Sequence, residues 1–163
     1  MSRTEISAAP GIPLIIVSRE FDAPCELVFR AHIEPDLLER WLGPRDLTLT
    51  VERWEARDCG AWRYVNTGAD GATYGFRGVF HGDPSPRAIV QTFEYEGAPG
   101  HVALRTTAFT ERGGRTLVRM VSAFQSVEDR DAMVASGMAR GVHDSGDRLA
   151  ELLTTLHTNP GDT

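Results

Sequence analysis

The chain has 163 residues, a length typical of one domain, and its hydrophobic fraction of 41% and charged fraction of 25% are ordinary for a globular protein. All 17 basic residues are arginine, so the chain has no lysine for a Schiff base or a P-loop, and both enzyme classes are excluded. The formal net charge is −6, and the arginines are scattered singly among carboxylates, which predicts no nucleic-acid partner.

The sequence shows no feature of a membrane or secreted protein. No apolar run approaches the roughly 20 residues that a membrane span needs, and the acidic N-terminal stretch contains no hydrophobic signal segment. Cys25 and Cys59 are too far apart in sequence for a metal or redox motif, so we expect free thiols in a cytoplasmic protein. The five histidines are isolated, so we predict neither a metal site nor a cofactor.

The domain organisation follows from the two ends of the chain. We predict a single domain over residues 12–156, preceded by a loose leader at 1–11 and followed by a frayed tail at 157–163. β-Branched residues dominate the run from Ile12 to Phe21, which predicts that the domain begins with a strand.

Two short helices and a series of strands are predicted next. The helices span Cys25 to Ile33 and Pro35 to Leu42, and Gly43 with Pro44 ends the second. From Leu47 to Phe124 apolar side chains alternate with polar ones in six segments, which predicts six strands. Because only short turns rich in glycine and proline separate them, neighbouring strands must run antiparallel, as in a meander.

After Ser126 the apolar residues again recur at helical spacing. We predict that Ser126 is the N-cap of a continuous helix of about 30 residues. Apolar residues form one broad stripe along it: Val134, Met138, Val142, Leu149, Leu152, Leu153 and Leu156. Such a helix must pack its apolar face on the sheet. The prediction is therefore an α+β fold in which a curved antiparallel sheet of about seven strands wraps around a long C-terminal helix, with two short helices between strands one and two.

The N-terminal half of the last helix is rich in small residues, whereas its C-terminal half is rich in leucine. Gly137 and Gly141 each cost about 1 kcal/mol of helix stability relative to alanine. Two interpretations stay open: these glycines line a ligand pocket, or they allow close backbone contact with the sheet.

Several motifs closely resemble one known family. They are Glu20 to Pro24, Arg40 to Pro44, Gly60 to Tyr64, Tyr74 to Gly78, Val90 to Glu94, Ser136 to Met138, Gly141, and Asp147 to Leu149. In these motifs the chain resembles the heat-shock-protein-90 ATPase activator homologues, a branch of the START-like (SRPBCC) superfamily, over residues 12–156. The resemblance implies the helix-grip fold, which hosts ligand carriers, cyclases and chaperone partners. The chain differs from the usual pattern at Leu42 and Val142, and both changes open room.

The candidate ligand-binding residues are the inward-facing aromatics and the side chains expected near the small-residue half of the helix. They are Trp41, Trp62, Tyr64, Phe76, Phe93, Tyr95, Arg105, Met120, Met133, Gly137, Met138 and Gly141. An inward Arg105 would bind a carboxylate ligand through its planar guanidinium. Met120 is predicted to face inward and Arg119 outward.

The leading functional hypothesis is a protein that binds a hydrophobic, aromatic or acyl small molecule between the sheet and the C-terminal helix. One alternative is a protein-interaction module of the chaperone-activator type, with a chaperone as partner. Another is an enzyme similar to polyketide cyclases and aromatases, for which His143 or His81 with Glu94 could supply acid–base groups. No catalytic residue is assigned, and the oligomeric state stays open, with a homodimer among the alternatives.

Overall fold

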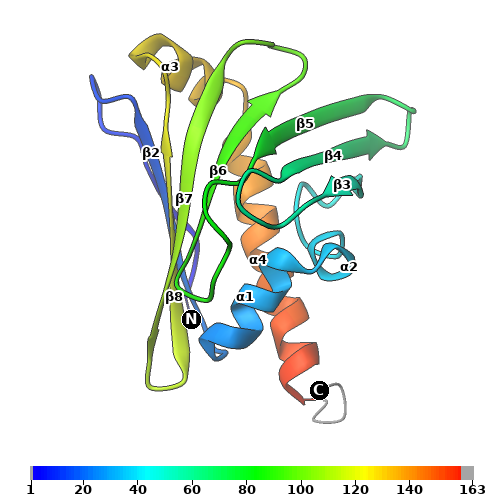
Figure 1. Cartoon of the computed structure of the whole chain (residues 1–163), viewed down its shortest axis with the longest axis vertical. Helices are drawn as coiled ribbons and strands as arrows, with labels where there is room; N and C mark the ends of the chain where they lie inside the picture. The colour runs from blue at the N-terminus through cyan, green and yellow to red at the C-terminus, as the bar shows by residue number, and fades with distance from the viewer. Residues whose placement is uncertain (1, 159–163) are drawn as a thin grey trace.

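The computed structural model describes residues 2–158 (Figure 1). The elements in chain order are β1 (Glu5–Ser7), β2 (Leu14–Phe21), α1 (Cys25–Ile33), α2 (Pro35–Leu38), β3 (Leu47–Trp54), β4 (Ala61–Gly68), β5 (Thr73–Val79), β6 (Ala88–Tyr95), β7 (Val102–Arg112), β8 (Arg115–Ala123), α3 (Val127–Ala135) and α4 (Met138–Thr158). All eight strands belong to one antiparallel sheet in the order β1-β2-β8-β7-β6-β5-β4-β3. The curved sheet holds α4 on its concave face (Figure 1), which confirms the predicted helix-grip fold.

The strands from β3 to β8 form the predicted meander, and β2 pairs with β8 along its whole length. The start of the chain differs from the prediction. Within the expected leader, Glu5–Ser7 forms β1 and pairs with β2, so the sheet has eight strands instead of about seven. Thr4 beside this strand is buried. The prediction of a loose leader was therefore wrong for this segment, because edge pairing and burial of Thr4 outweigh its weak strand pattern.

The predicted single C-terminal helix is two helices. Ser126 caps α3 by accepting a hydrogen bond from the Asp129 N–H, as predicted. α3 then ends at Ala135 with Ser136 as its C-cap, and Gly137 adopts a φ of +83°, a conformation that side chains disfavour and that ends helices. The glycine treated as a costly residue inside one helix is therefore the break between two. α4 extends to Thr158, so the frayed tail was wrong for residues 157 and 158, and residues 159–163 lie outside the described part of the chain.

The core lies between the C-terminal half of α4, α1 and the inner face of the sheet. Leu149, Leu152 and Leu153 are buried there against side chains that are likewise buried. These partners include Phe21, Val28, Trp41, Leu49, Ile89, Phe109 and Val118. The leucine-rich half of the helix is thus core, as predicted.

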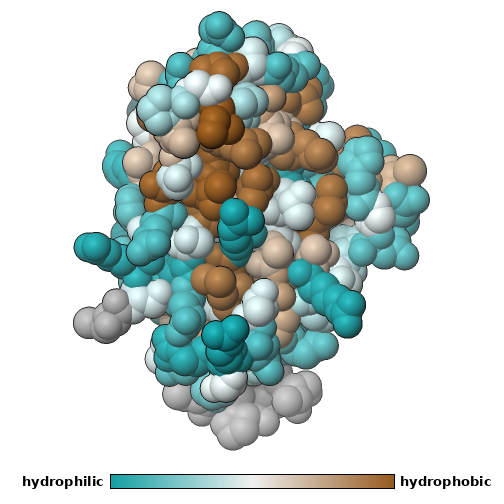
Figure 2. All heavy atoms as spheres, turned by 90° about the vertical axis from the view of Figure 1, so that its left-hand side faces the viewer, coloured by the Kyte–Doolittle hydropathy of each residue, from teal (hydrophilic) through white to brown (hydrophobic). Residues whose placement is uncertain are grey.

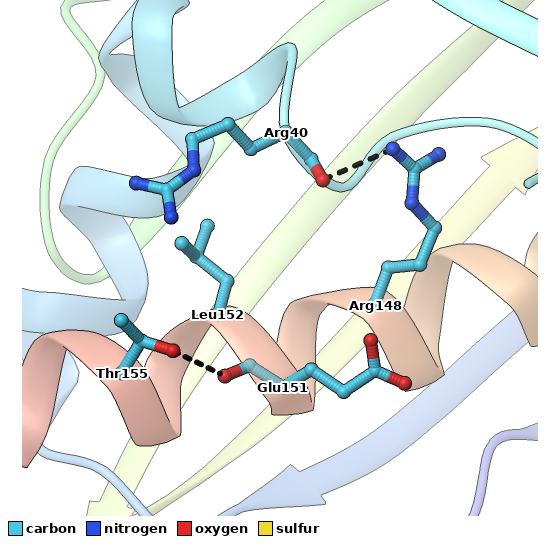
Figure 3. A pocket seen from close by; sticks show the side chains of 5 residues that line it. All are labelled: Arg40, Arg148, Glu151, Leu152 and Thr155. Carbon is cyan, nitrogen blue, oxygen red and sulfur yellow. Dashed lines mark hydrogen bonds between the residues drawn. The ribbon is translucent and has the colours of Figure 1, made fainter.

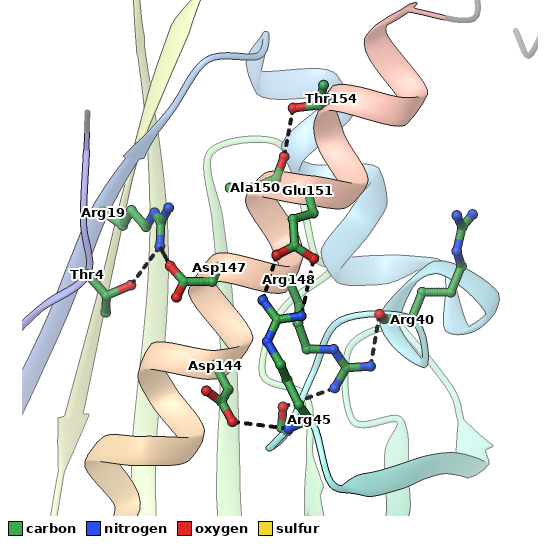
Figure 4. Close-up of polar contacts among 11 residues, drawn as sticks. Thr4, Arg19, Arg40, Arg45, Asp144, Asp147, Arg148, Ala150, Glu151 and Thr154 are labelled. Carbon is green, nitrogen blue, oxygen red and sulfur yellow. Dashed lines mark hydrogen bonds and ion pairs between the residues drawn. The ribbon is translucent and has the colours of Figure 1, made fainter.

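Polar contacts hold α4 to the sheet on one side and to the α2–β3 loop on the other (Figure 4). Arg19 of β2 donates to Asp147 at 2.7 Å. On the other side, Arg148 donates to the carbonyl oxygens of Gly43 and Arg40, each at 3.0 Å. Arg45 of the loop pairs with Glu151. A guanidinium with five N–H donors can bridge several acceptors, and these bonds define where α4 lies across the sheet.

The surroundings of Gly137 and Gly141 show whether these glycines allow close backbone contact with the sheet. A Cβ added at Gly137 would meet no atom within 4 Å, and one at Gly141 would meet only Pro44, at 3.4 Å. Neither glycine makes a close contact with the sheet. That role belongs to Gly146, where a Cβ would overlap Thr4 and crowd Arg19.

We therefore predict opposite effects of alanine at the two glycines. Gly137→Ala should lower the free energy of unfolding by about 1 kcal/mol, because the positive φ strains any side chain. Gly141→Ala should raise it by about 0.5–1 kcal/mol through helix propensity. Urea unfolding of both variants and the parent measures this. A destabilising Gly141→Ala would show that Gly141 needs the space that its missing side chain leaves.

A second prediction concerns His32. Its ring lies between the rings of Trp41 and Phe109, whose centroids are 4.8 and 5.1 Å away. Its Nδ1 lies 2.8 Å from the Val28 carbonyl oxygen. Burial lowers the pKa of His32 to about 4 from 6.5, although the Val28 contact opposes this. Between these values the unfolded chain binds the extra proton, so His32 should reduce stability as the pH falls from 6.5 towards 4.

The measurement is urea unfolding at pH 7 and pH 5. His32→Phe, which keeps the ring contacts, should lose less stability over this interval than the parent. His143→Gln on the exposed surface of α4 is the matched control. An equal loss in the parent and in His32→Phe would contradict the assignment.

Candidate functional site

Five aromatic side chains cover the concave surface of β4, β5 and β6, and we call them the aromatic face: Trp62, Tyr64, Phe76, Phe93 and Tyr95. Their positions alternate along the strands, so all of them point to the helix side. Ring centroids are 5.1 Å apart for Trp62 and Tyr64, 5.3 Å for Phe76 and Phe93, and 5.2 Å for Phe76 and Tyr95. The five rings therefore form one continuous apolar surface.

The aromatic face extends from the buried core to the protein surface. Trp62 is 1% exposed and packs edge-on near Trp54, while Tyr64 and Phe93 are also buried. Phe76 and Tyr95 are only half-buried. The deep end is thus packed, and the other end is open to contact.

The predicted cavity lining accordingly divides into two groups. Trp41, Trp62, Tyr64 and Phe93 belong to the buried core, where their neighbours fill the space around them. Trp41 donates its Nε1–H to the Ala31 carbonyl at 2.8 Å, in the layer formed by α1 and α2. The remaining predicted residues keep contact with solvent: Phe76, Tyr95, Arg105, Met120, Met133, Gly137, Met138 and Gly141.

The faces of β7 and β8 follow from burial. On β8, Met120 shares its side with the buried residues Val118 and Ser122, whereas Arg119 is exposed on the outer surface. On β7, Arg105 points inward beside Ala103, which is buried. Sequence alternation placed Met120 and Arg119 in this way but could not place Arg105.

Arg105 lies over the aromatic face. Its guanidinium carbon is 4.1 Å from the centroid of the Phe93 ring, a cation–π contact. Ala103 lies directly opposite Phe93 in the β6–β7 pairing, and its small side chain leaves room for this contact. Arg105 Nε donates to Ser122 Oγ at 3.5 Å, and the guanidinium also interacts with the Tyr64 hydroxyl. Burial lowers the pKa of Arg105 and raises that of Tyr64, and their mutual interaction opposes both shifts.

Two hollows that the sequence did not indicate lie elsewhere on the surface. One, of about 200 Å³, is lined by Arg40, Arg148, Glu151, Leu152 and Thr155 (Figure 3). Three of its polar side chains are engaged with neighbours: Arg148 with the Arg40 carbonyl, Glu151 with Arg45, and Thr155 with the Glu151 carbonyl. The exposed Arg40 guanidinium has no hydrogen bond to the described residues, so it is the main donor that this hollow offers a ligand.

The other hollow, of about 410 Å³, lies on the outer surface of β4, β5 and β6. Beneath it the β5–β6 ladder is interrupted, because the pairs at Phe76 and Arg77 are followed only by an isolated bridge between Phe80 and Gln91. Its charged side chains are already paired, Arg63 with Glu96 and Arg77 with Glu94. The interrupted ladder and the paired charges explain this hollow without a ligand.

The candidate acid–base residues do not form a catalytic pair. Glu94 is on the outer surface, where it accepts hydrogen bonds from the Gly100 N–H and from Arg77. The hydrogen bond from the Gly100 N–H has the largest effect and that from Arg77 the next largest, and together they hold the pKa of Glu94 below its usual value. A carboxylate with a low pKa is a weak base. His81 and His143 are exposed.

Residues 2–158 lack the arrangements that metal binding and membrane crossing by a helix require. Within them, no group of three or more His, Cys, Asp or Glu side chains is placed to hold a metal ion. None of the helices in this range combines the length and apolar character needed to cross a bilayer. Cys25 and Cys59 are both free thiols.

Comparison with known proteins gives the family. Residues 22–154 match the family described as "Activator of Hsp90 ATPase homolog 1-like protein". A crystal structure of a Rhodobacter sphaeroides protein is similar with a TM-score of 0.85 and 28% identity, covering 94% of this chain and 99% of that one. A solution structure from Arthrobacter aurescens also has a TM-score of 0.85, with 25% identity and coverage of 93% and 91%.

The crystal structure of Ms6760 from Mycobacterium smegmatis shows the same fold, with a TM-score of 0.84, 22% identity and coverage of 93% and 96%. No curated protein sequence matches significantly. The family match covers most of the chain, from the loop between β2 and α1 to the C-terminal part of α4. The chain therefore belongs to the family of Activator of Hsp90 ATPase homolog 1-like proteins.

Proposed function

We propose that the protein binds a hydrophobic or aromatic small molecule on the open end of the aromatic face, beneath the α3–α4 break. The observation that carries this proposal is the continuous ring surface that extends from the core and stays partly exposed at Phe76 and Tyr95. Exposed aromatic surface is costly in water, and a flat ligand would cover it.

Three partly exposed methionines add support to the proposal. Met120 lies on the inner side of β8, Met133 lies on α3, and Met138 begins α4 directly after the helix break. Methionine adapts its flexible side chain to varied ligand shapes.

The test uses a neutral aromatic probe, cinnamamide, followed by the three indole N–H signals in ¹⁵N NMR spectra. Trp41 and Trp54 donate to backbone carbonyls, while Trp62 Nε1 is buried in the aromatic face with no hydrogen-bond partner in the described chain. Binding on this face should shift the Trp62 signal more than the Trp41 signal.

Variants localise the binding. Tyr95→Ala should weaken cinnamamide binding about threefold to tenfold, because it removes half-buried aromatic contact area. Leu117→Ala, on the exposed outer surface of β8, should leave binding unchanged. Absence of any shift at millimolar cinnamamide, or equal effects of the two variants, would contradict the proposal.

A second candidate function is a protein-interaction module of the chaperone-activator type. The family description names an activator of a chaperone ATPase. In addition, apolar side chains gather on the outer surface of the sheet that Figure 2 faces. Leu104 of β7 is 46% exposed and Leu117 of β8 is 41% exposed. Stimulation of the host chaperone's ATPase that is lost in Leu104→Asp would support this candidate, and no effect at micromolar protein would count against it.

A further inference from the structure

Arg105 differs from the other arginines of residues 2–158 that are at least partly buried. Those bind acceptors that suit a guanidinium: a carboxylate for Arg19, Arg30, Arg63, Arg115 and Arg130, and backbone carbonyls for Arg148. Arg105 contacts a ring and two hydroxyl groups but no carboxylate or carbonyl. Its positive charge is thus neutralised by nothing in this part of the chain.

An unpaired, partly buried cation is costly for a folded protein. Withdrawal from water penalises the charge unless a partner compensates for it. The Phe93 ring offers only partial compensation, and the 3.5 Å contact with Ser122 is at the long limit of a hydrogen bond. Arginine keeps its charge at any physiological pH, so it cannot avoid the cost by losing a proton.

The position of Arg105 indicates what would compensate for it. Its guanidinium lies on the aromatic face, between Phe93 of β6 and Tyr64 of β4, and both of these rings neighbour the partly exposed Phe76. Arg19, another arginine on the inner side of the sheet, already pairs with Asp147. A single free cation matches a singly charged group, and the planar guanidinium matches a carboxylate through two parallel hydrogen bonds.

We propose that Arg105 anchors the carboxylate of the ligand, whose apolar part packs on Phe76 and Tyr95. The preferred ligands are therefore aromatic or hydrophobic acids. This inference rests on the proposed function and narrows it to a class of ligand.

The test compares two probes of nearly equal shape, trans-cinnamate and cinnamamide, by isothermal titration calorimetry. The parent should bind cinnamate about 10- to 100-fold more tightly, as expected for a charge-assisted pair. Arg105→Gln should lower cinnamate affinity to that of cinnamamide and leave cinnamamide unchanged. Arg119→Gln, which removes an exposed arginine from the outer surface of β8, should change neither.

The outcomes separate this inference from the proposed function. Equal binding of acid and amide by the parent would overturn the role of Arg105 but leave the aromatic face as a binding site. No binding of either probe would contradict both. An equal loss of cinnamate and cinnamamide binding in Arg105→Gln would show that the side chain only shapes the surface.

Thermal unfolding gives an independent prediction. If Arg105 is kept for a ligand, Arg105→Met should raise the Tm of the ligand-free protein by about 2–4 °C, because it removes an uncompensated charge. Millimolar cinnamate should raise the Tm of the parent but not that of Arg105→Met. A clear fall in Tm of ligand-free Arg105→Met would identify Arg105 as a structural residue and contradict the inference.

Discussion

The packing of three leucines of α4 into one end of the curved sheet is the constraint on which the rest of the structure depends. Leu149, Leu152 and Leu153 complete the core with α1 and the inner side chains of the sheet. The helix has no comparable run of leucines at its N-terminal end, which includes Gly141. At the other end of the aromatic face Phe76 and Tyr95 stay partly exposed to solvent.

A chain without lysine has to use guanidinium groups wherever it needs a cation, and their geometry explains two different parts of this protein. Along α4, Arg19, Arg45 and Arg148 each bind carboxylates or carbonyls that place the helix across the sheet. Exposed pairs of this kind contribute little to stability and mainly determine position. Arg105 has the same N–H donors, but it binds no carboxylate and contacts a ring and hydroxyl groups instead.

Most of the fold could be predicted from the sequence because its signals are local: alternation in the strands, glycine-rich turns, and the Ser126 cap. Weak or ambiguous local signals explain the errors. Glu5–Ser7 is a strand only because β2 offers it an edge, and Gly137 reads equally well as a costly helical residue or as a break. The site was harder to predict, since alternation places side chains on a face but does not show which are covered by α4. Trp62 and Phe76 follow the same pattern, yet only the second is open to solvent.

Family membership explains the fold, whereas the class of ligand depends on the side chains of this particular chain. The central claim is that an aromatic acid binds at the open end of the aromatic face. Methyl-labelled NMR with trans-cinnamate tests it most directly, because methyl groups mark both surfaces of the sheet. The account predicts a shift at Met120, which lies two residues from the Arg105 contact Ser122 on the inner side of β8, and none at Leu104 and Leu117 on the outer surface. Shifts confined to the two leucines, or no shifts at all, would contradict it.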